Sequence, residues 1–287
     1  MARQDLFVRL DATLYRVERP WGRLPDGAGR VTDVSADAEG RVYVLLRSDP
    51  YVDAATPAVA VLSSEGALLA AWGAGAVADG HMLTVSPDGR VFVVDRDAHE
   101  IIIFDREGTR LGGLGTRHGP GEPFNAPSDV AFGPDGTIYV ADGYAATRIH
   151  RFSPEGVPLG GWGEPGAMDG QFTTPHAIWV LPDGTVAVTD RENDRLQLFT
   201  AEGHFLRAFG SIPRVMNVVG DAEGRLYVTD QIPRLSMYEA TGKLLGRCRP
   251  VLNGAHGMWR SPTGMFYLAE GNPSRVTRLV PVEAAKA

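Results

Sequence analysis

The sequence predicts an all-β fold, a six-bladed β-propeller, on two observations. The first is a glycine turn, acidic in five of its six copies, that precedes an alternating apolar run such as RVFVVD or TIYVAD. The second is a last repeat that lacks one strand, which the start of the chain can supply. The marker glycines are Gly40, Gly89, Gly136, Gly184, Gly224 and Gly264, spaced 40 to 49 residues apart. A fixed period of this length is typical of propellers and solenoids.

Each repeat is expected to form a four-stranded antiparallel meander. A third run, such as EIIIF at 100–104 or RLQLF at 195–199, follows the alternating run, and a second glycine turn then precedes a fourth run. Acidic-glycine turns between runs of period two are typical of hairpins. The expected blades span about 31–73, 80–115, 127–163, 175–210, 215–248 and 255–281.

The two ends of the chain are expected to close the ring. The sixth repeat stops after its third strand, at about residue 281. The segment from about 12 to 22 ends in Trp21-Gly22, just as two fourth strands end in Trp72-Gly73 and Trp162-Gly163. We therefore expect this N-terminal strand to complete the last blade. Residues 1–287 then form a single propeller domain, in which residues 116–127 are a loop between blades.

Composition excludes several classes of protein. With 44% hydrophobic and 22% charged residues, the chain is typical of an ordinary globular protein rather than a disordered one. Its net charge of −7 argues against a nucleic-acid partner or an anionic membrane surface. One cysteine, Cys248, permits no internal disulfide. Residues 1–17 hold no apolar secretory segment and no stretch is long enough to span a bilayer, so we expect a cytoplasmic protein.

Histidine recurs at one position of the repeat. The first strand of every propeller blade lines the central channel. The residues eight places before the marker glycines are Thr32, His81, Ser128, His176, Met216 and His256. Histidine therefore stands in every second blade, and three imidazoles are expected to converge on the axis. Three neutral imidazoles with a fourth position open are typical of catalytic zinc. The alternative is that these rings only form hydrogen bonds within a polar channel.

Arginine recurs where the second strand of a blade ends. The residues seven places after the glycines are Arg47, Arg96, Gly143, Arg191, Gln231 and Gly271. A guanidinium at the channel mouth suits an anionic planar group, because its fork binds carboxylate through two hydrogen bonds. Acidic neighbours in the sequence favour the alternative of surface salt bridges, above all for Arg96. The recurrent Asp95, Asp142, Asp190 and Asp230 are interpreted as turn residues that define the repeat.

Two segments carry a resemblance to a known family. SDVAFGPDGTIYVADGYAATRIHRFSPEG at 128–156 and TPHAIWVLPDGTVAVTDRENDRLQLF at 174–199 resemble NHL-repeat propellers, and within them the peptidyl-α-hydroxyglycine α-amidating lyases. The resemblance covers about residues 31–280. It implies a zinc ion held by His81, His176 and His256. It also implies that Tyr144 is the catalytic base, and that Arg47 and Arg191 flank the substrate.

The sequence departs from this family at three positions. The resemblance implies a calcium ion bound by the backbone carbonyls of Val34 and Leu83, but the family's aspartate ligand is replaced by Gly257. This replacement argues against calcium. A methionine of the family's pocket falls on Gly254, and a cysteine beside the tyrosine falls on Ala145. The pocket is therefore expected to be wider, or shaped for another substrate.

The resemblance implies a zinc-dependent carbon–nitrogen lyase. Such an enzyme cleaves a carbinolamide, an N-acyl- or ureido-α-hydroxyglycine, to an amide and glyoxylate. Zinc would favour ionisation of the substrate hydroxyl, Tyr144 would take its proton beside Arg191, and Arg47 would clamp the substrate carboxylate. The expected partner is an anionic small molecule or short peptide. Two alternatives remain open: a non-catalytic propeller that binds proteins, and a propeller lactonase or hydrolase.

Overall fold

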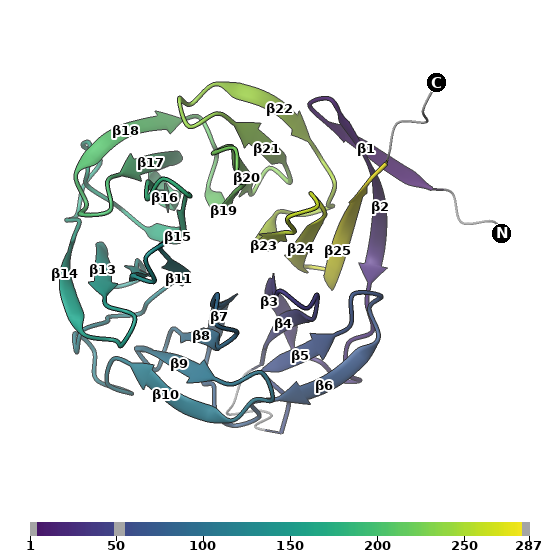
Figure 1. The fold of residues 1–287 in the computed structure, drawn as a ribbon, viewed down its shortest axis with the longest axis horizontal. Coiled ribbons are helices and arrows are strands. Elements are labelled where there is room, and N and C mark those ends of the chain that lie inside the picture. Colours follow the sequence, from purple (N-terminus) through teal and green to yellow (C-terminus); the bar gives the residue numbers. More distant parts are fainter. Residues whose placement is uncertain (1–4, 49–54, 283–287) are drawn as a thin grey trace.

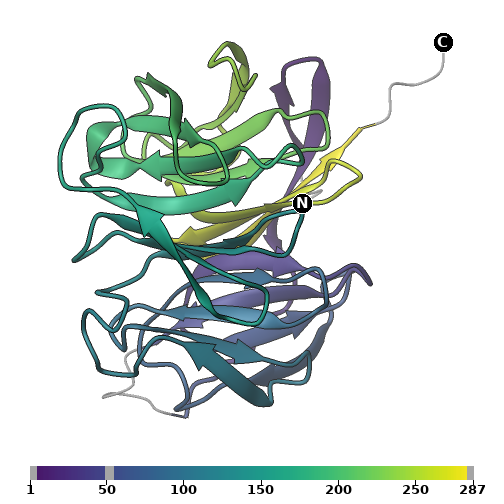
Figure 2. The same cartoon turned by 60° about the vertical axis from the view of Figure 1, so that its left-hand side comes forward.

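The computed structural model describes residues 5–48 and 55–282, and their strands form six antiparallel sheets around a central axis (Figures 1 and 2). The predicted all-β fold, a six-bladed propeller, is confirmed. Figure 1 shows the first strand of each blade nearest the axis and the last strand at the perimeter. The one short helical segment in the described ranges is the 3₁₀ turn η1 (Arg191–Asn193).

Five blades contain four consecutive strands each. Blades one and two consist of β3 (Arg30–Ala36), β4 (Val42–Arg47), β5 (Val59–Leu62), β6 (Leu68–Trp72), and β7 (Gly80–Val85), β8 (Val91–Asp95), β9 (Glu100–Phe104), β10 (Arg110–Leu114). Blades three and four consist of β11 (Asp129–Phe132), β12 (Ile138–Asp142), β13 (Arg148–Phe152), β14 (Pro158–Trp162), and β15 (Pro175–Val180), β16 (Val186–Asp190), β17 (Arg195–Phe199), β18 (Phe205–Gly210). Blade five consists of β19 (Val215–Gly220), β20 (Leu226–Asp230), β21 (Leu235–Tyr238) and β22 (Leu244–Cys248).

The sixth blade joins the two ends of the chain. Its C-terminal part consists of β23 (Ala255–Arg260), β24 (Phe266–Gly271) and β25 (Ser274–Pro281), and its N-terminal part of β1 (Leu6–Leu10) and β2 (Thr13–Trp21). Strand β2 pairs antiparallel with β25, with Val17 opposite Leu279. The predicted closure by an N-terminal strand is therefore confirmed (Figure 1). Strand β1 was not predicted, because it lies outside the repeat. A two-residue turn that begins at Asp11, whose φ is +51°, lets β1 pair antiparallel with β2.

The marker glycines form the turns between the first and second strands of the blades. All six have positive φ, from +77° to +86°, a conformation that side chains disfavour. Apolar side chains of neighbouring sheets pack between the blades and bury residues such as Phe92, Tyr139 and Phe199. Within the described ranges, no helix has the length and apolar character needed to cross a membrane.

A β-bulge interrupts the inner strand at the repeat position occupied by histidine. The pairing register shifts between Pro175 and Ala177 in blade four, and between Ala255 and Gly257 in blade six. The register also shifts in blades one, two and five. A bulge bends its strand and re-aims a side chain that regular pleating would direct elsewhere. Here it helps the residue at the bulge to face the axis.

Candidate metal centre and active site

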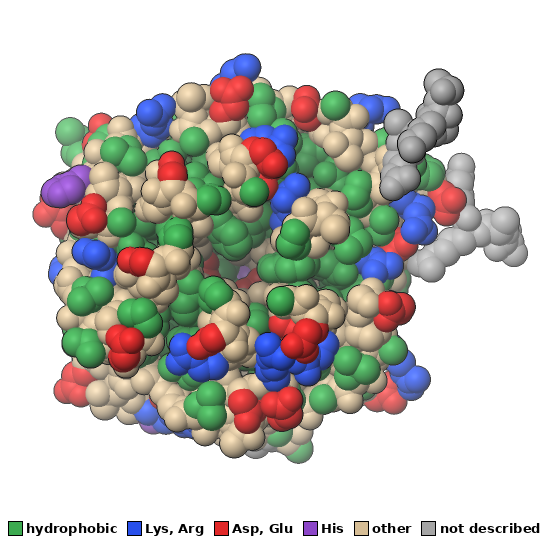
Figure 3. All heavy atoms as spheres, viewed as in Figure 1, with side chains coloured by type: hydrophobic (Ala, Val, Ile, Leu, Met, Phe, Trp, Pro, Cys, Tyr) green, Lys and Arg blue, Asp and Glu red, His purple; other side chains and the backbone are tan. Residues whose placement is uncertain are grey.

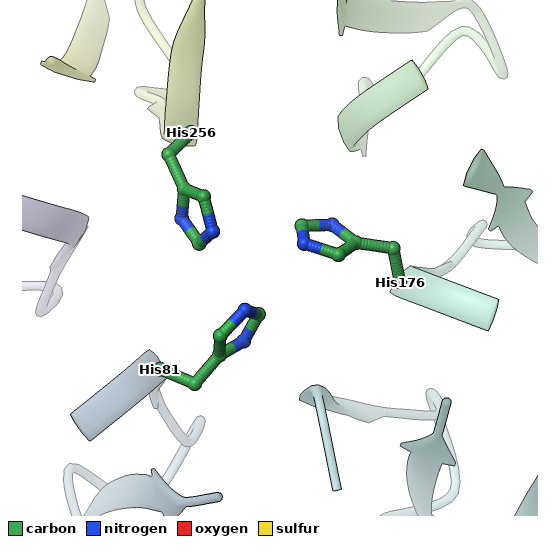
Figure 4. A group of neighbouring side chains, drawn as sticks. All are labelled: His81, His176 and His256. Carbon is green, nitrogen blue, oxygen red and sulfur yellow. The ribbon is translucent and has the colours of Figure 1, made fainter. Parts of the chain in front are cut away.

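Three histidines from alternate blades meet on the axis of the propeller. His81 comes from β7, His176 from β15 and His256 from β23, and Figure 4 shows the three rings pointing toward one another. Their ring centroids lie 5.0, 4.8 and 5.1 Å apart. One nitrogen from each ring lies within 4.8 Å of the other two. The structure thus brings together the three residues that the repeat register singled out.

Backbone carbonyls from the intervening blades orient all three imidazoles. The contacts join Nδ1 of His81 to Ser128 O (2.6 Å), Nδ1 of His176 to Met216 O (2.7 Å) and Nδ1 of His256 to Thr32 O (2.9 Å). A carbonyl only accepts, so each Nδ1 carries the proton and each Nε2 presents a lone pair. The non-histidine members of the repeat position therefore fix the tautomer of the histidine members.

The three rings are suited to binding a metal ion. Burial lowers the pKa of His81 and His176 well below the usual histidine value, and the neighbouring histidines lower it further. Burial also lowers the pKa of His256 to about 4. All three are therefore neutral at pH 7 and can act as ligands. Nε2 of His176 is buried without a hydrogen-bond partner among the described residues, and a metal ion would supply one. The donor set, three neutral imidazoles, fits zinc.

Tyr144 lies beside the histidines, at the end of β12. Its hydroxyl oxygen is 2.9 Å from Nε2 of His81 and accepts a hydrogen bond of 2.9 Å from Nη1 of Arg191. The guanidinium of Arg191 also lies 5.1 Å from the centre of the Tyr144 ring, and that of Arg96 lies 4.9 Å from it. Two cations therefore face one phenol.

Arg47 is paired to an acidic side chain. Its Nη2 donates to Oδ2 of Asp79 over 2.8 Å, its Nε donates to Oδ1, and Nη2 of Arg96 lies 2.7 Å from Oδ2. One carboxylate therefore holds two arginines. Arg191 is paired as well, because Oε1 of Glu192 accepts from its Nε and Nη2. Oδ1 of Asp97 accepts a further hydrogen bond of 2.9 Å from Nε of Arg96, so the three arginines face three carboxylates.

Sequence reasoning missed one member of this cluster and gave only part of the role of another. Arg96 forms the expected ion pair with its neighbour Asp97, and its guanidinium also faces the Tyr144 ring. Asp79 was not singled out at all, because it lies two residues before the histidine position and no repeat signal marks it. The recurrent aspartates have the structural role expected of them: Asp95 and Asp190 accept backbone N–H groups of the segments that lead into their blades.

At the position of the aspartate that the resemblance implied as a calcium ligand, Asp33 fills the space beside Gly257. The carboxylate of Asp33 accepts hydrogen bonds from the backbone N–H groups of Val34 (2.8 Å) and Leu83 (2.9 Å). A Cβ atom on Gly257 would lie 1.9 Å from Oδ1 of Asp33. No side chain at position 257 can therefore join the carbonyls of Val34 and Leu83 while Asp33 fills that space.

Comparison with known proteins gives sequence relatives for part of the chain. A probable peptidyl-alpha-hydroxyglycine alpha-amidating lyase of Caenorhabditis elegans is 35% identical over 98 residues, which are 33% of this chain and 28% of the relative. Peptidyl-alpha-hydroxyglycine alpha-amidating lyase 2 of Drosophila melanogaster is 27% identical over 144 residues, 48% of this chain and 32% of the relative. This chain resembles amidating lyases. The matched segments span about a third of those relatives or less, and no family model matches the chain.

Solved structures share the fold. A gluconolactonase from Xanthomonas campestris superposes with a TM-score of 0.75 at 15% identity, covering 98% of this chain and 96% of that one. A streptogramin B lyase superposes with a TM-score of 0.68 at 12% identity, covering 93% of this chain and 98% of that one. Identities this low show a common architecture, and the function must be argued from the site.

Proposed function

We propose that this protein is a zinc-dependent carbon–nitrogen lyase that cleaves an N-acyl- or ureido-α-hydroxyglycine to an amide and glyoxylate. The observation that carries the proposal is the convergence of three neutral imidazoles on the axis, with the Tyr144 hydroxyl 2.9 Å from one of them. The names of the sequence relatives support the same reaction class. The site residues of the proposal are His81, His176 and His256 as zinc ligands, with Tyr144, Arg191 and Arg47 around the substrate.

Bound by the three Nε2 atoms, a zinc ion would supply Lewis-acid stabilisation of negative charge on the substrate hydroxyl oxygen. Tyr144 takes the proton of that hydroxyl. Arg191 stabilises the anionic form of Tyr144 through the 2.9 Å contact to its oxygen, and the stacked guanidinium of Arg96 acts in the same sense.

The remaining bond changes balance without a redox partner. The oxygen that loses its proton forms the carbonyl of glyoxylate, the carbon–nitrogen bond breaks, and its electron pair goes to nitrogen. Nitrogen then takes a proton and leaves as an amide. Tyr144 holds the abstracted proton at its hydroxyl, from which the leaving nitrogen can receive it.

The arginines at the mouth are proposed to bind the carboxylate of an anionic substrate. Arg47 already uses two nitrogens on Asp79. The substrate carboxylate must therefore compete with Asp79 or share Arg47 and Arg96 with it. The ion pairs with Asp79 hold the guanidinium groups of Arg47 and Arg96 in place before substrate binds, so the substrate site is preorganised.

The test combines metal analysis with turnover. Protein loaded with zinc and freed of excess metal is assayed for glyoxylate release from N-acetyl-α-hydroxyglycine and from ureidoglycolate. We expect release from at least one substrate, and loss of release after removal of zinc with a chelator. A protein that carries one zinc ion and releases glyoxylate from neither substrate contradicts the proposal.

A further inference from the structure

A second cavity occupies the axis on the opposite side of the histidine layer. It has a volume of about 180 Å³ and is lined by inner-strand residues that follow the histidine position, down to Val85, Phe132 and Val219 at the strand ends. Tyr144 and Arg191 lie at the other end of the channel, where the inner strands begin. Figure 3 shows a central hollow on one face of the ring, rimmed mainly by hydrophobic side chains. The three histidines do not belong to the lining of this cavity.

Oxygen-bearing side chains from alternate blades line this cavity on the histidine side. Asp33 belongs to β3, Asp129 to β11 and Asn217 to β19, and each stands one residue after the position that holds histidine in the other three blades. The three are therefore about a third of a turn apart around the axis. The cavity has the same threefold arrangement as the metal centre, with side-chain oxygens in place of imidazole nitrogens.

Both carboxylates keep acceptor capacity. Asp33 accepts two backbone N–H groups, and Asp129 accepts those of Val130 (2.8 Å) and Ile178 (2.9 Å). Each carboxylate offers about four lone-pair sites, so about two remain on each. Burial raises the pKa of Asp33 well above the usual carboxyl value, and the charge of Asp129 raises it further. Burial also raises the pKa of Asp129 to about 7, so a bound ammonium group would displace these protons.

Asn217 points to a ligand. Its side chain is 5% exposed and lines the cavity. Its one side-chain contact of hydrogen-bond type within residues 5–48 and 55–282 is a weak one of 3.8 Å, from Nδ2 to Sδ of Met82. Buried amides are otherwise almost always paired, because an unpaired one loses its water contacts without compensation.

The walls of the cavity are apolar and carry no positive charge. Trp179, Trp259, Val85 and Phe132 line it, and no Lys, Arg or His among the described residues does. Arg225 and Arg260 line the wider recess that shares the two tryptophans with it. Two acidic groups at one end and two indoles in the lining form an environment that attracts an organic cation.

We propose that this cavity binds a small primary ammonium compound with a short apolar tail. An ammonium group on the axis directs three N–H bonds a third of a turn apart, toward Asp33, Asp129 and the amide oxygen of Asn217. The carbon chain then runs between Trp179 and Trp259. The volume of about 180 Å³ suits a small amine, and beyond Trp179 and Trp259 the cavity adjoins a wider recess of about 660 Å³.

The proposal is tested with n-butylammonium chloride by isothermal titration calorimetry and by the fluorescence of the channel tryptophans. We expect a dissociation constant of about 1 mM, which suits a ligand of this size. Tetramethylammonium, which has no N–H donor, and n-butanol, which has no charge, should each bind at least about tenfold more weakly. Failure of n-butylammonium to bind at about 50 mM, or equal binding of n-butanol, overturns the proposal.

Variants locate the site. Asp129→Asn should weaken n-butylammonium binding at least about tenfold, because it removes an ionisable partner of the ammonium group. Asp183→Asn is the matched control: Asp183 is exposed in the β15–β16 turn, contacts Thr185 N and does not line the cavity, so its affinity should be unchanged. Unchanged affinity in Asp129→Asn contradicts the proposal.

Two further variants distinguish binding in this cavity from misfolding and from binding at the histidine centre. Asn217→Leu, checked for folding by circular dichroism, should also weaken binding, and tests the site if Asp129→Asn does not fold. His176→Ala should retain n-butylammonium binding, because the cavity does not include the metal ligands. Loss of binding in a folded His176→Ala protein would mean that the ammonium group binds at the histidine centre instead.

Discussion

Replacing Tyr144 by phenylalanine removes one oxygen atom from the centre of the proposed site. That oxygen makes two contacts of 2.9 Å, to Nε2 of His81 and Nη1 of Arg191. Hydrogen bonds of this kind contribute about 0.5–1.5 kcal/mol each, so loss of the two should lower the free energy of unfolding by about 1–3 kcal/mol. Loss of a positioned base should cost about 10²- to 10⁴-fold in kcat, or about 3–5 kcal/mol of transition-state stabilisation.

The effect on turnover should therefore exceed the effect on stability. Glyoxylate release, zinc content and urea unfolding are measured on the same preparations. Tyr238→Phe is the matched control, because its hydroxyl accepts one hydrogen bond from Arg247 in an outer strand, far from the axis. It should keep full turnover. If Tyr144→Phe retains zinc and loses less than about threefold in kcat, Tyr144 is not the base and the proposed proton transfer is wrong.

Three other outcomes follow from the structure. His176→Ala should lose zinc binding and the rise in melting temperature that zinc gives, whereas His118→Ala, outside the centre, should keep both. Arg96→Met removes a cation stacked on the Tyr144 ring, so kcat should fall about tenfold while zinc content is unchanged; an unchanged kcat would exclude this role. Burial raises the pKa of Asp129 to about 7, so the native state holds this proton between about pH 4 and 7 while the unfolded state has lost it. The free energy of unfolding of the wild type should therefore fall by about 4 kcal/mol as pH rises through that window. Asp129→Asn has no such proton, so its urea unfolding should not show this fall. An identical pH dependence in wild type and variant would contradict the raised pKa of Asp129.

The fold followed from the sequence because the repeat is strict. Glycine turns at a fixed period set the hairpins, and the missing last strand indicated closure by the N-terminal segment. Strand β1 escaped prediction since it has no counterpart in the repeat. It forms because a two-residue turn at Asp11 returns the chain along β2.

The site was predictable where it obeys the same register. His81, His176 and His256 share one repeat position, so rotational symmetry alone brings them together. The bridge from Arg47 through Asp79 to Arg96 spans two blades, and its geometry depends on how those blades pack, which no repeat position encodes.

The polar residues of the second cavity also share one repeat position, but the sequence analysis did not single them out. Asp33, Asp129 and Asn217 stand one position after the histidine position, in the alternate blades, so the register contained that signal as well. Regular pleating would place successive residues on opposite faces of a strand. The bulges in blades one and five sit just before Asp33 and Asn217 and alter this alternation, which the sequence did not reveal.

The most direct test of the account is the metal content of the purified chain after equilibration with zinc and removal of the excess. Elemental analysis should find one zinc ion per chain in the wild type and none in His176→Ala, and X-ray absorption at the zinc edge should show three imidazole nitrogens around the ion. A wild-type chain that retains no zinc, or holds it equally well without His176, would contradict the central claim that the axial histidines form a metal centre.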